Sequence, residues 1–188
     1  MKQVSESVGA YYQHYPRIAV AVSAYHDGKA DAMTCGWHTP LSSRPPLFGV
    51  LLSTKRFTYK LIVDSGEFAV NFLPAEQAAL LAAIGGSKGA NMDKFAAFNI
   101  ARDIPLKTNA PVLAAAYAAY ECKLVDNRQY GDHQLLVGEV VAVHWLAEAF
   151  TEEETLDLKA IVPAFYLGSD KYLTKLKATV EKVERGKS

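Results

Sequence analysis

The chain has 188 residues, of which 50% are hydrophobic and 21% are charged, a composition typical of an ordinary globular protein. Its 20 basic and 20 acidic side chains cancel, and no basic tract is present, which argues against nucleic acid or an anionic membrane as the main partner. No apolar run approaches the roughly 20 residues of a membrane-spanning helix, and the first residues lack the apolar core of a signal peptide. We therefore expect a single domain over residues 1–188, located in the cytoplasm.

Strands dominate the expected secondary structure. Apolar, β-branched and alternating segments predict strands over residues 18–25, 30–35, 47–53, 67–73, 112–125 and 134–145. An Asp27–Gly28 turn closes the first two as a hairpin, and a turn over residues 127–131 joins the last two. The alanines in 112–125 favour a helix by propensity, but the strict alternation from Tyr120 to Val125 favours a strand.

The expected helices are few and short. One follows an N-cap at Ser53 or Thr54, has an apolar stripe of Phe57, Leu61 and Ile62, and ends near Gly66. Others are expected over residues 75–84, briefly around residues 94–95, and over the amphipathic tail at 170–185. Strands and helices do not alternate as a parallel sheet requires. The simplest architecture is therefore mainly β, an antiparallel barrel with peripheral helices.

Residues 32–43 have the composition of a segment that contacts a ligand. They follow a strand directly and combine small, hydroxyl-bearing and aromatic side chains. Small residues let the backbone approach a flat polar ligand and donate its N–H groups, and Trp37 can form a wall of the pocket. Taken alone, a tryptophan is most often part of the core.

Two further segments could carry chemistry. Residues 53–58 place hydroxyl groups and the Arg56 guanidinium at a helix N-terminus, which favours an anion such as phosphate. Residues 131–133, Gly-Asp-His, form a turn before a strong strand. A hydroxyl at a helix start is more often only a cap, and such a turn is usually only a turn. The glycine-rich residues 85–89 follow a helix, so we interpret them as its cap and a loop.

Several common catalytic signatures do not occur in the sequence. It contains no GxGxxG, Walker, HExxH or GxSxG motif, and its five histidines lack metal-ligand spacing. The two cysteines, Cys35 and Cys122, form neither a disulfide framework nor a CxxC pair. No metal site is predicted.

Taken in order, the short motifs of the chain resemble one family. They lie at residues 28–37, 44–46, 56–58, 66–71, 93–95, 121–122, and 131–133 with 138–140. This succession is similar to that of the flavin reductase-like, FMN-binding split-barrel proteins, and most of all to their flavoredoxin-like branch. The resemblance covers about residues 15–143 and leaves 150–188 as a C-terminal extension.

The resemblance implies an antiparallel Greek-key split barrel that binds FMN and works as a homodimer. Carried over by position, the isoalloxazine ring would be lined by Thr34, Cys35, Gly36 and Trp37, and the phosphate would be held by Ser53, Arg56 and Thr58. Asn71 would support the flavin loop by hydrogen bonding, and Lys94 would reach the polar edge or the phosphate of the flavin. His133 would lie near the flavin or the nicotinamide and is the candidate catalytic residue.

The chain departs from the family pattern at two positions in the flavin loop. Asp31 stands where relatives often have Asn, and Gly36 stands where they have Ala or Ser. The resemblance therefore supports flavin binding more firmly than it supports a particular electron donor.

Three functions remain open at this point. The first is an oxidoreductase that transfers a hydride from NADH or NADPH to flavin and passes electrons to an acceptor. The second is an FMN-binding electron carrier that lacks a nicotinamide site and is reduced by a redox protein partner. The third is a barrel that has lost flavin and serves as an interaction or structural module, for which Asp31 is the only support.

Overall fold

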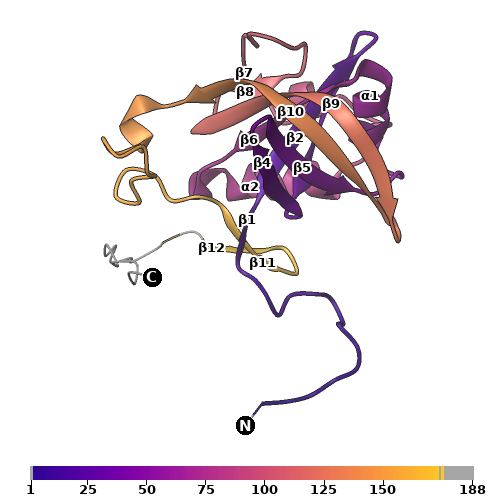
Figure 1. Cartoon of the computed structure of the whole chain (residues 1–188), viewed down its shortest axis with the longest axis vertical. Coiled ribbons are helices and arrows are strands. Elements are labelled where there is room, and N and C mark those ends of the chain that lie inside the picture. Colours follow the sequence, from indigo (N-terminus) through magenta and orange to yellow (C-terminus); the bar gives the residue numbers. More distant parts are fainter. Residues whose placement is uncertain (1, 174, 176–188) are drawn as a thin grey trace.

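A curved antiparallel sheet of seven strands forms the body of the computed structural model, which describes residues 2–173 and 175 (Figure 1). The strand order is β3-β2-β6-β9-β10-β5-β4. The strands are β2 (Val20–His26), β3 (Lys29–Cys35), β4 (His38–Ser43), β5 (Pro46–Leu52), β6 (Glu67–Phe72), β9 (Ala118–Tyr130) and β10 (His133–Trp145). Every neighbouring pair is antiparallel, so the expected fold class is confirmed.

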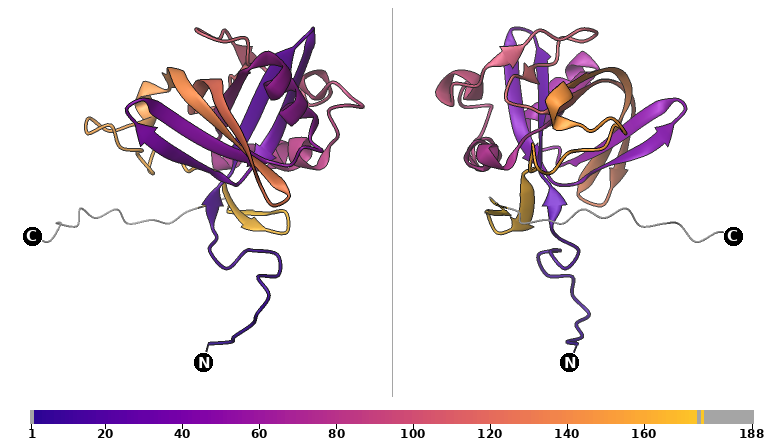
Figure 2. Two further views of the ribbon diagram at one scale, coloured as in Figure 1. Left: turned by 45° about the vertical axis from the view of Figure 1, so that its right-hand side comes forward. Right: turned by 90° about the vertical axis from the view of Figure 1, so that its left-hand side faces the viewer.

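The sheet curls into a barrel that stays split between its two edges (Figure 2). Edge strand β3 turns into edge strand β4 through Gly36 and Trp37 alone. The backbone N–H of Leu51 in β5 donates to the carbonyl of Trp37 at 2.9 Å, which ties this corner to the far side of the sheet. The chain then crosses from β5 back to the middle of the sheet, where β6 lies between β2 and β9.

Strand β2 separates two hydrophobic cores because its side chains alternate between the two faces of the sheet. Val20, Val22 and Ala24 belong to the barrel interior, which α1 (Phe57–Ser65) closes with Leu61 and Ile62. Ala19 and Ala21 belong to the second core, on the opposite face.

The second core lies under short helices and small sheets. It contains Leu81 and Ile84 of α2 (Ala78–Gly86) and Phe95 of α3 (Lys94–Ala97). The remaining elements are β1 (Arg17–Ile18), η1 (Ala75–Gln77), β7 (Arg102–Asp103), β8 (Val112–Leu113), η2 (Ala147–Ala149), β11 (Phe165–Gly168) and β12 (Lys171–Leu173). Strands β1, β11 and β12 form a separate small sheet below the barrel (Figure 1).

Several local expectations about the strands are corrected. Residues 38–43 form an edge strand rather than a loop, because they pair with β5; Pro40 is tolerated there. The segment 112–125 is interrupted, because β8 leaves the main sheet to pair with β7 and only residues from Ala118 onward join it. Strand β9 continues to Tyr130, so the final turn is shorter than residues 127–131.

Two expectations about helices are also corrected. The N-cap of α1 is Arg56 rather than Ser53 or Thr54, and no side chain caps this helix. Residues 171–173 of the expected C-terminal helix form a strand that pairs with β11. The rest of that expected helix lies almost entirely outside the described residues.

The first hairpin turn is confirmed in detail. Asp27 and Gly28 both have positive φ, at 47° and 74°, as the turn that suits the twist of a two-residue hairpin requires. Within residues 2–173 and 175, no helix is long and apolar enough to span a membrane.

Candidate functional site

A cleft of about 840 Å³ opens beside the β3–β4 corner. Its walls are the end of β3, the N-terminus of α1, the loop after α2, and the start of β10. Every predicted site residue except Asn71 lines it, namely Thr34, Cys35, Gly36, Trp37, Ser53, Arg56, Thr58, Lys94 and His133. The volume lies within the range of cofactor pockets, about 300–1,000 Å³.

The end of β3 presents a fixed backbone to the cleft. The Thr34 hydroxyl donates to the carbonyl of Leu81 in α2, and the Cys35 thiol donates to the carbonyl of Trp37 at 3.3 Å. Burial raises the pKa of Cys35 to about 11, so its thiol stays protonated at neutral pH. Neither side chain is a free reactive group, and both hold this corner of the backbone in place.

The N-terminus of α1 is suited to an anion. Helix amides of the first turn have no partner within the helix, and no side chain caps them here. Lys55 and Arg56 are exposed at this end, and the Ser53 hydroxyl lies beside them, accepting a hydrogen bond from the Lys55 N–H at 3.4 Å. Three sources of positive potential therefore converge: the helix dipole and two cationic side chains.

Thr58 differs from Ser53 because its hydroxyl is already occupied. It is fully buried and donates to the Oδ2 atom of Asp31 at 2.6 Å. Although Thr58 lines the cleft, its hydroxyl serves the Asp31 carboxylate.

A buried ion pair lies at the floor of the cleft. The Lys94 ammonium donates to the carbonyls of Ala32 at 2.7 Å and Ile84 at 3.0 Å, and it lies 3.2 Å from the Oδ1 atom of Asp31. Burial lowers the pKa of Lys94, and the neighbouring Asp31 carboxylate opposes that shift. The ammonium thus has three oxygen partners in the protein. It joins β3 to the end of α2, and the expected contact of Lys94 with a flavin stays a prediction.

The loop after α2 is packed against this ion pair. An added Cβ on Gly89 would lie 2.2 Å from the Oδ1 atom of Asp31, and one on Gly85 would lie 3.2 Å from Thr34. Gly85 at the end of α2 and Gly89 in the following loop let this segment approach β3 closely, so Ser87, Lys88 and their neighbours also line the cleft. The expectation that residues 85–89 form a helix cap and a loop is corrected in part, because α2 continues through Gly86 and its C-cap is Ser87. The sequence interpretation also missed the place of the loop in the site.

His133 lies at the start of β10, on the rim of the cleft. Its ring contacts that of Trp37, with centroids 4.8 Å apart, and its Nδ1 atom lies 2.8 Å from the Asp132 carboxylate. The hydrogen bond to His133 lowers the pKa of Asp132. This contact fixes the orientation of the ring and leaves Nε2 as the second polar atom.

Asn71 does not line the cleft, and its expected role behind the flavin loop stays a prediction. It is fully buried in β6, where its amide donates to the Ala21 carbonyl and the Ser23 hydroxyl. Its side-chain oxygen accepts from the Leu113 N–H at 2.8 Å. The residue therefore joins β2, β6 and β8 because a buried amide needs such partners.

Two tyrosines that the sequence interpretation did not assign also line the cleft. Tyr15 accepts a hydrogen bond from the indole N–H of Trp37 at 3.2 Å. Tyr166 comes from β11, and its ring centroid lies 5.8 Å from that of Tyr15. No local motif marks either residue, since only the pairing of β1 with β11 brings them together.

Over the described part of the chain, no three His, Cys, Asp or Glu side chains gather as a metal site would require. The observed features define a split-barrel protein with a large cleft. That cleft offers a backbone corner, an aromatic wall and a cationic helix end, which suits a flat ligand with an anionic group.

The family follows from comparison with known proteins. The family model described as the flavin reductase like domain matches residues 12–170, and the chain belongs to this family. The match extends beyond residue 143, the limit expected from the motifs, and includes Tyr166.

Two relatives illustrate the range of similarity. An uncharacterized protein of Aeropyrum pernix is 34% identical over 157 residues, which is 82% of this chain and 58% of that protein. The chain therefore spans less than two thirds of that relative's length. The FMN reductase (NADH) RutF 2 of Methylorubrum extorquens is 29% identical over 153 residues, covering 80% of this chain and 85% of the relative.

Solved structures share the fold along almost the whole chain. An FMN-binding protein from Thermus thermophilus, with bound 1-cyclohex-2-enone, has a TM-score of 0.85 and 29% identity, covering 97% of this chain and 99% of that one. The flavoredoxin of Methanosarcina acetivorans has a TM-score of 0.83 at 23% identity, covering 96% and 95%, and shows the fold alone.

Proposed function

We propose that the chain binds FMN in the cleft and acts as an NAD(P)H-dependent flavin reductase. The observation that carries this proposal is the meeting of the 34–37 backbone corner with the uncapped N-terminus of α1 in one cleft. Membership in the flavin reductase-like family and the name of the RutF 2 relative support the same chemistry.

The residues present fit the two ends of FMN. The first-turn amides of α1, together with Ser53 and Arg56, suit a dianionic phosphate, and Lys55 adds a second cation at the same end. The backbone around Thr34 to Trp37 suits a flat heteroaromatic ring that needs hydrogen-bond donors. When bound, FMN supplies the chemistry of accepting a hydride from a nicotinamide and delivering electrons onward.

The side chains contribute binding and positioning. Trp37 and His133 form one wall of the cleft, and Asp132 holds the His133 ring by its Nδ1 atom. His133 is the candidate for the residue that contacts a nicotinamide or an acceptor. Thr58 and Lys94 act below the ligand, because both hold the Asp31 carboxylate and thereby the floor of the cleft.

We also propose that the chain forms a single domain, that two copies assemble as a homodimer, and that the protein is located in the cytoplasm. The long hairpin β9–β10 leaves Val125, Tyr130, Val143 and Trp145 exposed, the last at 62% of its surface. Such exposed apolar side chains are candidates for burial by a second copy. Size-exclusion chromatography with light scattering tests this: a mass of two chains supports it, and a single-chain mass at micromolar concentration contradicts it.

Stopped-flow spectroscopy tests the reductase proposal. The FMN-loaded chain is mixed with NADH, and separately with NADPH, under anaerobic conditions. Saturable loss of the oxidised flavin absorbance with either nucleotide supports a reductase. Bound FMN that neither nucleotide bleaches would contradict the reductase and leave the electron carrier reduced by a partner protein.

A further inference from the structure

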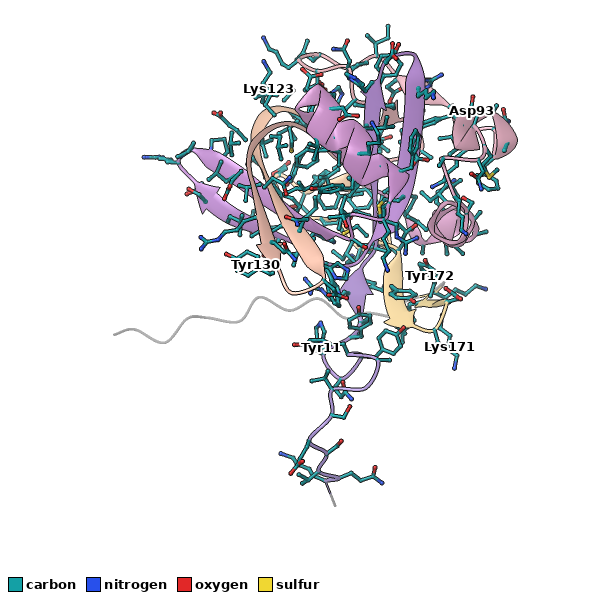
Figure 3. The ribbon with its side chains drawn as sticks, turned by 90° about the vertical axis from the view of Figure 1, so that its right-hand side faces the viewer. Tyr11, Asp93, Lys123, Tyr130, Lys171 and Tyr172 are labelled. Carbon is teal, nitrogen blue, oxygen red and sulfur yellow. The ribbon has the colours of Figure 1, made fainter. Side chains whose placement is uncertain are left out.

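A second pocket, separate from the cleft, lies between the N-terminal segment and the β3–β4 corner. Its volume is about 400 Å³, and aromatic rings line much of it, from Tyr11, His14, Trp37 and His38. We call it the N-terminal pocket. Figure 3 shows Tyr11 on the N-terminal segment, at the end of the molecule where Tyr172 also lies.

Trp37 is shared by the two sites. Its ring contacts His133, which lines the cleft, with centroids 4.8 Å apart, and Tyr11, which lines the N-terminal pocket, at 5.9 Å. Leu51 also lines both sites. A ligand in the N-terminal pocket would therefore lie next to the cleft without occupying it.

The charge in this pocket comes from Arg17. Its guanidinium donates to the carbonyl of His38 at 3.0 Å, and across the described residues it makes no ion pair with a carboxylate. A guanidinium has five N–H donors in a planar fork, so one carbonyl leaves most of them free. Arg17 is half-buried among rings, where an unpaired cation is costly.

The other titratable groups facing Arg17 do not neutralise it. Within the described residues, His38 makes no hydrogen bond with a carboxylate, and its Nε2 atom lies 2.9 Å from the Ile18 carbonyl. Burial lowers the pKa of His38, so its ring is neutral at pH 7. The other titratable side chains that line the pocket, His14 and Tyr11, carry no carboxylate. Among the described residues no carboxylate pairs with Arg17, so we look for the anion in a ligand.

We propose that the N-terminal pocket binds a small aromatic carboxylate. The ring would lie among Tyr11, His14 and Trp37, and the carboxylate would accept a two-point hydrogen bond from Arg17. The fork of a guanidinium matches the two oxygens of a carboxylate, and aromatic rings pair well with a flat ring. This proposal does not depend on FMN, because none of the polar residues assigned to the phosphate lines the N-terminal pocket.

Calorimetric titration of the full chain with benzoate tests the proposal, with FMN-loaded and FMN-free protein compared. Benzyl alcohol is the uncharged probe of similar shape, and acetate is the carboxylate without a ring. Saturable binding of one benzoate per chain is expected, at least tenfold tighter than binding of either other probe. In a Trp145→Phe background, benzoate should also change the fluorescence of Trp37, which is then the only tryptophan.

Arg17→Met should weaken benzoate binding at least tenfold and leave the affinity for FMN unchanged. The matched control is Arg44→Met, since Arg44 is exposed and lines neither site; it should bind benzoate as the natural chain does. Circular dichroism checks that each variant is folded. If Arg17→Met does not fold, the role of the positive charge is tested on the natural chain, by comparing its affinity for benzoate with its affinity for benzyl alcohol.

Three results would overturn the proposal: no benzoate binding up to concentrations on the order of 10 mM, equal binding of benzyl alcohol, or unchanged affinity in folded Arg17→Met. Acetate binding as tight as benzoate would overturn the aromatic part and leave a simple anion site. A chain that binds benzoate but takes up no FMN would contradict the proposed function alone.

Discussion

Two buried charges, Asp31 and Lys94, hold the floor of the cleft. The Asp31 carboxylate receives the Thr58 hydroxyl and lies 3.2 Å from the Lys94 ammonium, while Gly89 packs directly against it. Sequence analysis identified Asp31 only as a position at which the chain departs from the family pattern. Its pairing with Lys94 was out of reach because the two residues come from β3 and α3, far apart in the chain.

Breaking this buried pair should destabilise the fold strongly. Removing one partner leaves the other charge buried without its counter-ion, which typically costs about 3–5 kcal/mol. We therefore expect Lys94→Met to lower the free energy of unfolding by about 3 kcal/mol in urea denaturation. The double variant Asp31→Asn/Lys94→Met should lose less than the sum of the two single variants.

Lys60→Met is the matched control for a lysine in an ion pair. Lys60 pairs with Asp64 on the surface of α1, where a pair contributes only about 0–1 kcal/mol. Additive losses for the buried pair, or a loss as small as that of Lys60→Met, would contradict the role assigned to Lys94.

Glu121 should set the acid stability of the chain. Burial alone would raise its pKa, but hydrogen bonds from His144 and from the N–H groups of Leu106 and Lys107 hold the pKa at about 2, below the ordinary 4.5. A carboxyl whose pKa is depressed by folding stabilises the native state above its unfolded pKa and loses that contribution as pH falls toward the folded value. The shift corresponds to about 3 kcal/mol.

Unfolding free energies measured between pH 6 and pH 3 test this expectation. The natural chain should lose stability progressively below about pH 4.5. Glu121→Gln, which cannot ionise, should be less stable at pH 6 and should show a flatter acid limb. If the free energy of unfolding falls equally steeply with pH in both proteins, Glu121 is not the source of the acid sensitivity.

Arg56 is the side chain with the clearest expected effect on cofactor affinity. Arg56→Ala removes a charge-assisted contact at the end of α1 and should weaken FMN binding by about 1.5–3 kcal/mol. Arg44→Ala, which changes an exposed arginine outside the cleft, should leave the dissociation constant unaltered. Equal affinities of Arg56→Ala and the natural chain would refute the phosphate assignment.

At the scale of elements, strands with a clear alternation were predictable, and so was the hairpin at Asp27–Gly28. The errors arose where tertiary pairing decides. Residues 38–43 form a strand because they pair with β5, and residues 171–173 form a strand because they pair with β11. Asn71 looked like a site residue by its motif, yet the alternation of β6 turns it away from the cleft toward Leu113.

The loop after α2 was recognised as a loop, but its role depends on how closely it approaches β3. Gly89→Ala tests that approach, since the new methyl would collide with Asp31 at 2.2 Å. We expect this variant to be less stable and to bind FMN at least tenfold more weakly, because one wall of the cleft must move. Fluorescence titration and urea denaturation measure the two effects.

Gly86→Ala is the control for this substitution. Gly86 lies in α2 with no atom within 4 Å of an added Cβ, so alanine should be neutral or stabilising by up to about 1 kcal/mol. Similar behaviour of the two variants would contradict the close packing of the loop on Asp31.

At the scale of the whole molecule, the order of motifs along the chain was sufficient to predict the split barrel. The site residues predicted from the same motifs line one cleft of the structure, with the exception of Asn71. Tyr15 and Tyr166 show the limit of sequence reasoning: they come from opposite ends of the chain and meet through the β1–β11 pairing. Distances between such segments are a property of the assembled fold and leave no local pattern.

The central claim is that this cleft is an FMN site. Its most direct test is a titration of FMN with the purified full chain, followed by quenching of the flavin fluorescence. The account predicts saturable binding with one FMN per chain, and weaker binding by Arg56→Ala. A chain that is colourless as purified and quenches no FMN fluorescence would contradict the claim.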